Sequence, residues 1–360
     1  MSSVLDPAPA AAGRPRPPSQ DALAEERRRF QAVLESMVEG VLLLDAERRV
    51  TLFNPAASRL LGLPPEPLGR GLLELSRSPA LHGLVERARA GEVAEAELDA
   101  GPLRRLRARA APLAGSSEVS VVVHDVTELR RLEAIRKDFV ANVSHELRTP
   151  ISVIRANAET LLAGALEDGE RARGFVEALL RNAERLSALI SDLLDISRLE
   201  SGARRLERRP LDLAEAVRQV LESVEPAAVS RGHALASAVP PGLMAVGDDK
   251  ALAQVLTNLL DNAIKYTQDG GRILVRGGHQ PGAVRLEVVD DGPGIEPQHR
   301  TRIFERFYRV DKGRSREMGG TGLGLSIVKN LIEALGGQVG VEPGARSGSV
   351  FWITLPEVGP

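Results

Sequence analysis

The chain has 360 residues, with 47 lysines and arginines against 49 aspartates and glutamates, so its formal net charge is −2 at pH 7. The length fits two or three domains, and 43% hydrophobic with 27% charged residues fits a globular protein with packed cores. The near-neutral charge excludes binding to nucleic acid or membranes by bulk electrostatics. The lack of cysteine excludes disulfides, zinc ribbons, iron–sulfur centres and thiol nucleophiles.

Residues 1–21 are rich in proline and alanine and carry almost no large apolar side chain. Such a segment cannot bury enough surface to offset its ordering entropy, so we expect a disordered tail. No apolar run approaches the roughly 20 residues that span a bilayer, and no basic-then-apolar signal segment opens the chain. We therefore expect a soluble, cytoplasmic protein.

Residues 22–126 alternate between short helical and strand-like patterns. A helix-like start leads to Gly40, and Asn54-Pro55 opens a short helix that ends at Gly62. The segment predicts a small α+β domain, with strand patterns over 41–44, 50–53, 103–112 and 119–123.

Residues 127–203 carry two long helical patterns joined by a break at 167–169. We expect Pro150 to interrupt and kink the first helix. Leu179, Leu186 and Leu193 in the second lie seven residues apart, which is the spacing of a helical bundle seam. The two helices predict an antiparallel hairpin that pairs with a second copy as a homodimeric four-helix bundle.

Residues 204–360 predict a mixed α/β domain that follows an arginine-rich hinge over 201–210. Helical patterns cover 212–223, 248–265 and 322–335, and strand patterns cover 272–275, 284–289, 338–341 and 350–355.

His145 is the first candidate for chemistry. At 100° per residue it lies far around the helix from the apolar stripe, so we expect its imidazole to face solvent. The adjacent Glu146 could orient one ring nitrogen and leave the other free as a nucleophile. A histidine alone is more often an ordinary surface residue. No second histidine follows one turn later, which excludes a zinc-protease helix.

Asn258, Asn262 and Lys265 share one face of the predicted helix over 248–265, opposite its apolar residues. Such a face can offer an amide oxygen to Mg²⁺ and positive charge to phosphates, although a solvated helix face is an equal alternative.

Two glycine-containing segments follow. Asp290 precedes Gly292-Pro293-Gly294, where a carboxylate at a strand end can accept a hydrogen bond from an adenine amino group. The segment from Gly320 to Gly324 opens a helix and could present backbone N–H groups to phosphate, but it is neither a Walker nor a Rossmann loop. Seven basic residues between Arg300 and Arg316 could cover a triphosphate, or could simply be solvated.

In this order, the motifs resemble those of the sensor histidine kinases of two-component systems. The resemblance covers about 127–357 and rests on five segments: 139–150 (H box), 258–266 (N box), 290–294 (first glycine box), 303–309 (F box) and 320–325 (second glycine box). Residues 22–126 resemble a PAS sensor domain through Glu39-Gly40-Val41, 54–57 and Asp125-Val126-Thr127, and 77–81 is similar to phosphate-regulon sensors. A packing module without a ligand is an equal alternative for this domain.

The resemblance implies a multidomain α+β protein: a PAS-like sensor, a dimeric four-helix bundle and a Bergerat-type α/β sandwich that binds ATP and Mg²⁺. It implies that His145 is the phosphoacceptor, Glu146 its orienting base, and that Arg309 approaches the phosphates. Asn258 would coordinate Mg²⁺ and Asp290 would recognise adenine. The other implied nucleotide-site residues are Asn262, Lys265, Tyr266, Gly292, Gly294, Gly320, Thr321, Gly322, Leu323 and Gly324.

The implied reaction is autophosphorylation of His145 followed by transfer to an aspartate of a response regulator. Glu146 with Thr149 matches the pattern associated with phosphatase activity toward that regulator. An unknown small molecule or protein would act at the PAS domain. Asp291, where asparagine is frequent, could modestly change nucleotide affinity, and the membrane helices of many relatives are missing here.

Two other functions stay open. One is a catalytically silent scaffold or ligand-binding PAS protein, which the filled motif positions disfavour. The other is an ATP-driven chaperone or topoisomerase-like ATPase, which gives no reason for an exposed His145. Acid-labile phosphate on histidine separates the kinase from both.

Overall fold

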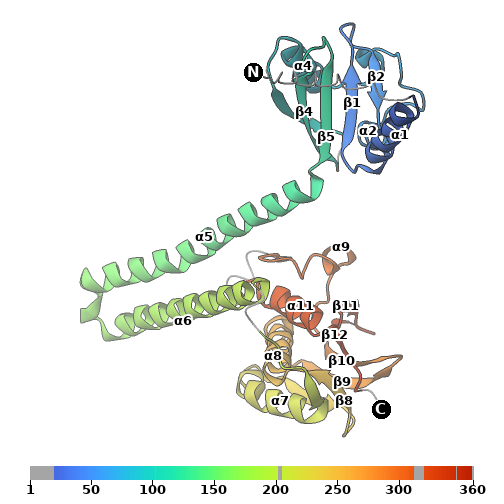
Figure 1. Cartoon of the computed structure of the whole chain (residues 1–360). Coiled ribbons are helices and arrows are strands. Elements are labelled where there is room, and N and C mark those ends of the chain that lie inside the picture. The colour runs from blue at the N-terminus through green and yellow to red at the C-terminus, as the bar shows by residue number, and fades with distance from the viewer. Residues whose placement is uncertain (1–19, 102, 202–204, 312–319, 346, 359–360) are drawn as a thin grey trace, which may run out of the picture. The chain divides into compact units, whose positions relative to one another are not determined.

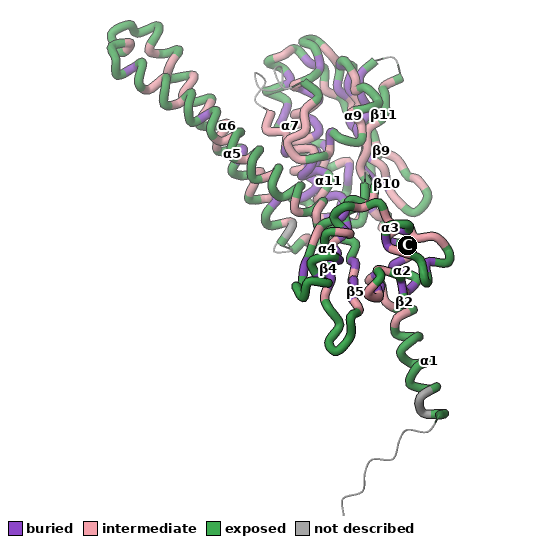
Figure 2. The backbone as a smooth tube through the Cα atoms, turned by 90° about the horizontal axis from the view of Figure 1, so that it is seen from above, coloured by how far each residue is buried: buried purple, intermediate pink, exposed green. Residues whose placement is uncertain are grey.

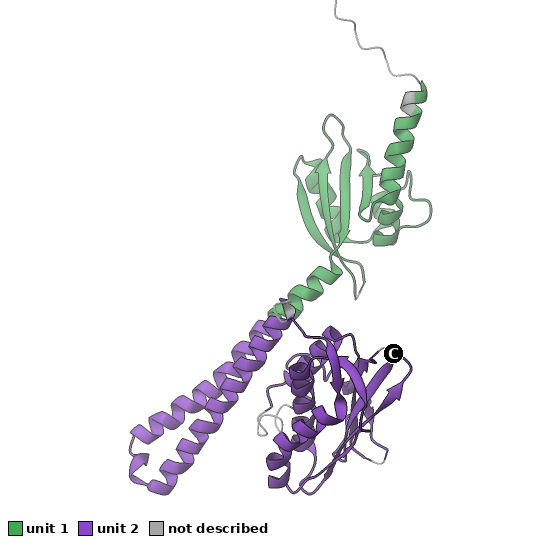
Figure 3. Cartoon of the chain, turned by 60° about the horizontal axis from the view of Figure 1, so that its bottom comes forward, with its two compact units in different colours: residues 1–137 green, residues 138–360 purple. Residues whose placement is uncertain are grey.

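The computed structural model describes residues 20–101, 103–201, 205–311, 320–345 and 347–358. The chain divides into two compact units, Met1–Lys137 and Asp138–Pro360, with the boundary inside helix α5 (Thr127–Leu162) (Figure 3). Residues 1–19 of the predicted tail lie outside the described residues, and its last two residues already belong to helix α1 (Gln20–Ser36).

The first unit is built on a five-stranded antiparallel sheet in the order β2-β1-β5-β4-β3 (Figure 1). Helix α2 contacts β1 and β5, and α4 contacts β3, β4 and β5. The strands are β1 (Gly40–Leu44), β2 (Val50–Phe53), β3 (Ala94–Asp99), β4 (Arg105–Pro112) and β5 (Val119–Asp125), and the helices after α1 are α2 (Pro55–Leu61), α3 (Leu72–Leu75) and α4 (Pro79–Arg89).

Strand β3, which the sequence patterns did not predict, lies at the edge of this sheet. Its segment Ala-Glu-Ala-Glu-Leu-Asp has few residues of high strand propensity. Ala94 and Leu98 are nevertheless buried, and the acidic residues between them face arginines of β4, such as Glu97 opposite Arg107. Cross-strand pairs with β4 therefore stabilise β3, although its residues have low strand propensity.

Asn54 holds the turn between β2 and α2 and is buried. Its Oδ1 accepts hydrogen bonds from the backbone N–H groups of Val41 and Ala57, both at 2.9 Å. Its Nδ2 donates to the carbonyls of Leu34 at 3.0 Å and Glu39 at 2.8 Å. One amide thus caps α2 and ties it to β1 and to the end of α1.

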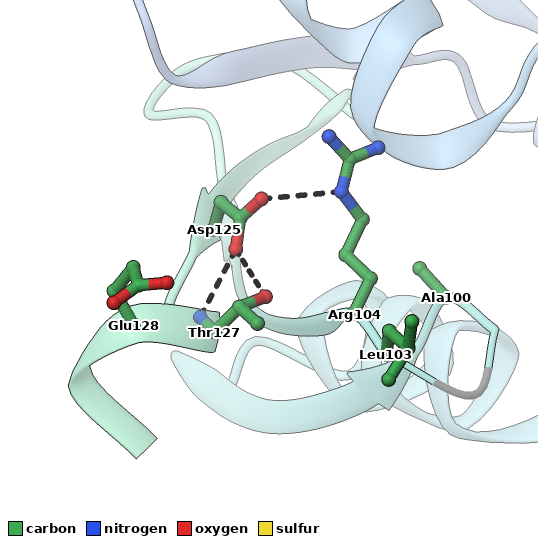
Figure 4. A pocket seen from close by; sticks show the side chains of 6 residues that line it. All are labelled: Ala100, Leu103, Arg104, Asp125, Thr127 and Glu128. Atoms are coloured by element: carbon green, nitrogen blue, oxygen red, sulfur yellow. Dashed lines mark hydrogen bonds and ion pairs between the residues drawn. The ribbon is translucent and has the colours of Figure 1, made fainter. Parts of the chain in front are cut away.

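The exit from the sheet into α5 is also hydrogen-bonded. Asp125 accepts from the N–H and hydroxyl groups of Thr127 and from Nε of Arg104 at 3.1 Å (Figure 4). These residues line an open depression of about 720 Å³ together with Ala100, Leu103 and Glu128. The predicted exit segment 125–127 is therefore the N-terminal anchor of α5.

The second unit begins with a helical hairpin, as predicted. Helix α5 is followed by the short 3-10 helix η1 (Ala165–Glu167) and by α6 (Gly169–Glu200), which Asp168 caps. The predicted interruption at Pro150 is wrong, because α5 runs on through it to Leu162. Proline removes a single N–H donor, and in a 36-residue helix the hydrogen bonds of the turns before and after Pro150 remain.

The rest of the second unit is a five-stranded sheet in the order β11-β12-β10-β9-β7, with a separate β6-β8 pair. Helices α7, α8 and α11 cover it (Figure 1). The elements are β6 (Arg209–Asp212), α7 (Leu213–Ser230), β7 (Ala234–Ala238), β8 (Met244–Gly247), α8 (Asp249–Tyr266), β9 (Arg272–Gln280), β10 (Ala283–Asp290), α9 (Pro297–Arg300), α11 (Gly324–Ala334), β11 (Val339–Pro343) and β12 (Ser349–Pro356).

The predicted helices and the four predicted strands of this domain are present, and three short strands are additional. Arg209 and Pro210 of the predicted hinge belong to β6, which pairs with β8. The short strand β7 pairs in parallel with β9. Four- and five-residue strands give too little periodicity for a pattern to identify them.

One continuous core joins the hairpin to this domain. Leu189 and Ile196 of α6 are buried in the same cluster as Leu256 and Leu259 of α8 and Ile327 of α11. Figure 2 shows the buried segments of the chain in purple. Across the residues that the structure describes, no helix combines the length and the apolar character needed to cross a bilayer.

Asn54→Ala tests the turn in the first unit. The change removes four hydrogen bonds and strands buried backbone groups, so we expect local stability to fall by about 2–4 kcal/mol. Hydrogen exchange of residues 40–60 in the full chain measures the loss, with α8 as internal reference. Thr51→Ala, an exposed position bonded to Glu118, should cost less than about 0.5 kcal/mol. Equal protection in both variants would contradict this role of Asn54.

Candidate active site

His145 lies on the exposed side of α5, as its helical position predicts. Thr149, one turn further on, is also exposed and its hydroxyl donates to the carbonyl of His145 at 3.3 Å. The imidazole is therefore accessible, with a hydroxyl group one helical turn away.

Glu146 is not a free acid beside the histidine. Its Oε2 accepts from Nη2 of Arg185 on α6 and from Nη2 of Arg309, both at 3.2 Å. The Arg309 side chain is 6% exposed, and those of Glu146 and Arg185 are 16% exposed. Charge pairs this shielded are weakly screened by salt, so the carboxylate links the two hairpin helices to the segment that follows α9.

Arg309 is held on its other side by the second glycine segment. Its Nη2 also donates to the carbonyl of Gly320 at 2.5 Å. Gly322 has a φ of 74°, and a Cβ there would lie 3.0 Å from Cα of Phe307 and 3.2 Å from Nε of Arg309. The N–H of Phe307 donates to the carbonyl of Gly322, and its ring lies 5.8 Å from that of Phe139 of α5, centroid to centroid, at a tilt of 46°. The F box, the second glycine box and the H box thus meet here.

Helix α8 carries the amide face that its spacing predicts. Leu252, Leu256, Leu259 and Ala263 are buried, whereas Asn258, Asn262 and Lys265 are only partly so. The Nδ2 group of Asn258 donates to the carbonyl of Gln254 at 3.0 Å. A Cβ on Gly324 would lie 2.7 Å from Oδ1 of Asn258, so glycine allows α11 to start directly against this amide oxygen.

Asp290 ends β10 as a buried carboxylate. Its Oδ1 accepts from the N–H groups of Gly292 at 2.9 Å and Ser349 at 3.2 Å. Burial raises the pKa of Asp290, the two N–H donors lower it less, and the charge of Asp291 raises it slightly. Among the described residues, none donates a hydrogen bond to Oδ2.

Asp291 has a structural role that the sequence did not suggest. Its Oδ1 accepts from the N–H of Arg272 at 2.8 Å, which fixes the start of β9. The expected effect of its charge on nucleotide affinity stays untested.

Several residues at the site escaped the sequence analysis. Gly348, at a φ of 80°, lies so close to Asp290 that a Cβ would meet the carbonyl oxygen of Asp290 at 1.9 Å. This contact brings Ser349 to the carboxylate. A Gly-Ser pair before the last strand is the signal that could have indicated it.

Helix α6 also contacts the second glycine segment and helix α8. The hydroxyl of Thr321 donates to Asp192 at 2.7 Å, and Nε2 of Gln254 donates to Asp195 at 2.6 Å. Burial raises the pKa of Asp192, while the Thr321 hydrogen bond lowers it. The partners are 129 positions apart in the Thr321–Asp192 contact and 59 apart in the Gln254–Asp195 contact, so no local sequence pattern could reveal either.

Most of the predicted site residues come together, with two qualifications. Leu323 is fully buried, so its side chain belongs to the core, and its N–H donates to the hydroxyl of Thr321 at 3.2 Å. Lys312, Arg314 and Arg316 of the basic segment lie outside the described residues. Tyr266 is the last residue of α8, and its carbonyl lies next to Gly292. Gly294 lies four residues after Asp290.

The residues present fit a purine nucleotide and a hard cation. Gly322, at a positive φ, lies next to Arg309, Gly324 lies against Asn258, and Asp290 offers a fixed carboxylate. In the described part of the chain no group of three acidic or histidine side chains could hold a metal ion by itself. An amide oxygen together with phosphate oxygens is, however, a normal Mg²⁺ environment.

Three family models match the chain. Residues 247–359 match the histidine kinase-, DNA gyrase B- and HSP90-like ATPase, residues 135–202 match the His Kinase A phospho-acceptor domain, and residues 28–92 match a PAS domain. The expected ATP-binding domain, phospho-acceptor domain and PAS sensor are thereby confirmed at the level of the family.

The curated relatives are sensor kinases. The phosphate regulon sensor protein PhoR of Pseudomonas aeruginosa is 33% identical over 90% of this chain and 75% of its own length. SenX3 of Mycobacterium tuberculosis is 38% identical over 66% of this chain and 57% of its own, and WalK of Bacillus subtilis is 31% identical over 92% and 56%. The chain thus spans little more than half the length of these last two.

Among solved structures, the histidine kinase ThkA in complex with the response regulator protein TrrA aligns with a TM-score of 0.52 at 26% identity, over 91% of this chain and 98% of that one. The Acinetobacter baumannii histidine kinase AdeS aligns with a TM-score of 0.50 at 26% identity, over 60% and 98%. The resemblance to phosphate-regulon sensors stated from the sequence is confirmed. With an exposed histidine on a phospho-acceptor hairpin and an ATPase-type domain after it, this chain belongs to the sensor histidine kinases.

Proposed function

We propose that the chain uses ATP and Mg²⁺ to phosphorylate its own His145 and then passes the phosphoryl group to an aspartate of a response regulator. The observation that carries this proposal is the ion pair between Glu146 and Arg309. It joins the neighbour of the exposed histidine to the segment that also holds the glycine loop at Gly320 and Gly322.

Each nucleotide-site residue has a role that its surroundings support. Oδ2 of Asp290 accepts the adenine amino group, because Oδ1 is already occupied by two backbone donors. Asn258 offers Oδ1 to Mg²⁺, which would neutralise phosphate charge when bound. Lys265 and Asn262 lie on the same face of α8 and would bind the phosphates. Gly292, Gly294, Gly320, Thr321, Gly322 and Gly324 would line the nucleotide site.

The phosphoryl transfer itself is mostly a matter of position and charge. A ring nitrogen of His145 forms the N–P bond while the bond between the γ-phosphorus and the ADP oxygen breaks. Glu146 orients the ring and takes up the imidazole proton. Two arginines hold Oε2 of Glu146, and Arg309 would leave this oxygen to approach the phosphates.

A homodimer and a response regulator are the proposed partners. Apolar side chains stay exposed along the hairpin of this single chain, and a four-helix bundle would cover them; they include Val140, Ile151, Val176, Leu180, Ile190 and Leu194. The ThkA structure contains a response regulator, which supports the same partner class here.

The PAS unit is proposed to regulate the kinase in response to an unknown small molecule or protein. Its support is the hydrogen-bonded exit at Asp125 and Thr127, which ties the last strand of the sheet directly to α5, the helix that bears His145.

His145→Gln is the first test. Incubation of the full chain with γ-labelled ATP and Mg²⁺ should give label that is lost in acid and kept in base, and the variant should lose it entirely while still binding ATP. Retained acid-labile label in the variant would contradict the assignment of His145. Intact ATP binding without label in the unchanged chain would favour a scaffold.

Thr149→Ala tests the proposed phosphatase activity. Loss of the hydroxyl one turn from His145 should slow dephosphorylation of the phosphorylated regulator at least tenfold, equivalent to ~1.4 kcal/mol of transition-state stabilisation. Autophosphorylation should change less than about twofold. Thr160→Ala, which removes a similar hydroxyl further along α5, is the control. An unchanged dephosphorylation rate would rule out this role.

Asp290→Asn separates binding from stability. Burial raises the pKa of Asp290, so its ionised form opposes folding at neutral pH, and this effect fades as pH falls through the raised pKa. The amide removes that charge, so thermal stability at pH 7 should not fall. ATP affinity should fall at least about tenfold, because an amide N–H₂ opposes the adenine amino group. Unchanged affinity would contradict the adenine role.

A further inference from the structure

The C-terminal end of α8 carries Lys265 and Tyr266, two of the residues proposed for the nucleotide. The last carbonyls of any helix lack intrahelical partners, and the end frays unless something else binds them. Here Thr267 closes one of them, because its N–H donates to the carbonyl of Ala263 at 3.0 Å. The following carbonyls, those of Ile264 and Lys265, are bound from outside the helix.

Arg231, in the turn after α7, supplies most of that binding. Its Nη1 donates to the carbonyl of Ile264 at 2.5 Å and to that of Lys265 at 2.9 Å. Its Nε donates to Oδ1 of Asp269 at 2.9 Å. The Arg231 guanidinium therefore binds both the last turn of α8 and the turn that follows it. Its positive charge also complements the partial negative charge at the C-terminal end of the helix.

His233, two residues later, adds a second donor. Its Nε2 lies 3.2 Å from the carbonyl of Ile264, so that nitrogen carries the proton. The ring is buried. The turn over residues 231–233 is in addition tied to the turn after α8, since the N–H of Gly270 donates to the carbonyl of Arg231 at 3.0 Å.

The capped end lies directly against the adenine side of the site. A Cβ on Gly292 would lie 3.3 Å from the carbonyl oxygen of Tyr266 and 3.5 Å from Cα of Thr267. Gly292 is the residue whose N–H binds Asp290. A small displacement of the end of α8 would consequently move Lys265 and Tyr266 relative to Asp290.

We infer that Arg231 is a positioning residue for the nucleotide: it fixes the C-terminal turn of α8 so that Lys265, Tyr266 and Asp290 bind ATP in one geometry. This inference rests on the nucleotide site of the proposed function. Arg231 itself points at two carbonyls and a carboxylate of the protein and acts through the helix end that it holds.

The test compares full-chain variants at Arg231 with a matched arginine. Arg231→Met keeps the apolar stem and removes every donor, and Arg231→Lys keeps the charge but not the fork. Arg218→Met is the control, because Arg218 lies exposed on α7 and forms its ion pairs with Glu215 and Glu222 of the same helix. The measurements are the ATP dissociation constant, the KM for ATP, kcat of autophosphorylation and the melting temperature.

Arg231→Met should weaken ATP binding and raise KM about threefold to thirtyfold, the range for loss of a charge at a helix end, with kcat changed less than about twofold. Arg231→Lys should recover part of the affinity, and Arg218→Met should match the unchanged chain. Affinity measured well below the melting temperature separates this effect from a mere loss of stability.

The contrary outcomes are distinct. If Arg231→Met lowers the melting temperature but leaves the dissociation constant and KM unchanged, Arg231 is only a structural cap and the inference is wrong. If kcat falls with KM unchanged, it acts on the chemical step and the inference is likewise wrong. If the unchanged chain itself neither binds ATP nor gains label on His145, the proposed function fails first, and that result is visible without any variant at Arg231.

Discussion

Helix α8 has two faces, and the division between them is the constraint on which the second unit depends. One face buries leucines and alanines against the sheet, α7 and α11, and so fixes the axis and rotation of the helix. The positions of Asn258, Asn262 and Lys265 on the opposite face of the helix are thereby fixed. Core burial, worth about 25 cal/mol per Å² of apolar surface, thus sets the geometry of the polar residues that bear the chemistry.

Glycines allow the segments around α8 to approach their neighbours closely. Gly324 permits α11 to begin against the Asn258 amide, and Gly348 permits the start of β12 to touch the end of β10. The second contact places Ser349 on Asp290, whose buried carboxylate would otherwise have one N–H donor fewer. A buried carboxylate needs such donors, and each glycine therefore acts through the polar group that it allows a neighbour to reach.

The hairpin contributes to the site as well as to dimerisation. Glu146 accepts from arginines of α6 and of the F box, while Asp192 and Asp195 accept from Thr321 and Gln254. Three of these polar contacts, Glu146–Arg309, Asp192–Thr321 and Asp195–Gln254, together with the Phe139–Phe307 ring contact, hold the hairpin on the ATPase-type domain. The proposed move of Arg309 from Glu146 to the phosphates would break one of them and would couple phosphorylation of His145 to the contact between this domain and the hairpin.

The sequence by itself determined the long, periodic elements and the residues of the nucleotide motifs, because amphipathic helices and glycine segments are local patterns. It also placed His145 on the solvent side of its helix, a matter of angular spacing alone. It missed β3, β6, β7 and β8, whose short or charged segments are strands only through their partners. It placed an interruption at Pro150, where the helix is continuous because a proline removes only one of its many hydrogen bonds.

Tertiary structure alone decided which charges meet. Glu146 and Arg309 are 163 positions apart, Asp192 and Thr321 are 129 apart, and Arg231 is more than 30 positions from the carbonyls that it binds. Side-chain pairing over such separations depends on how the helices pack, and periodicity carries no information about it. The kinds of residue the site uses were therefore legible in the sequence, whereas the partners that orient them followed only from the fold.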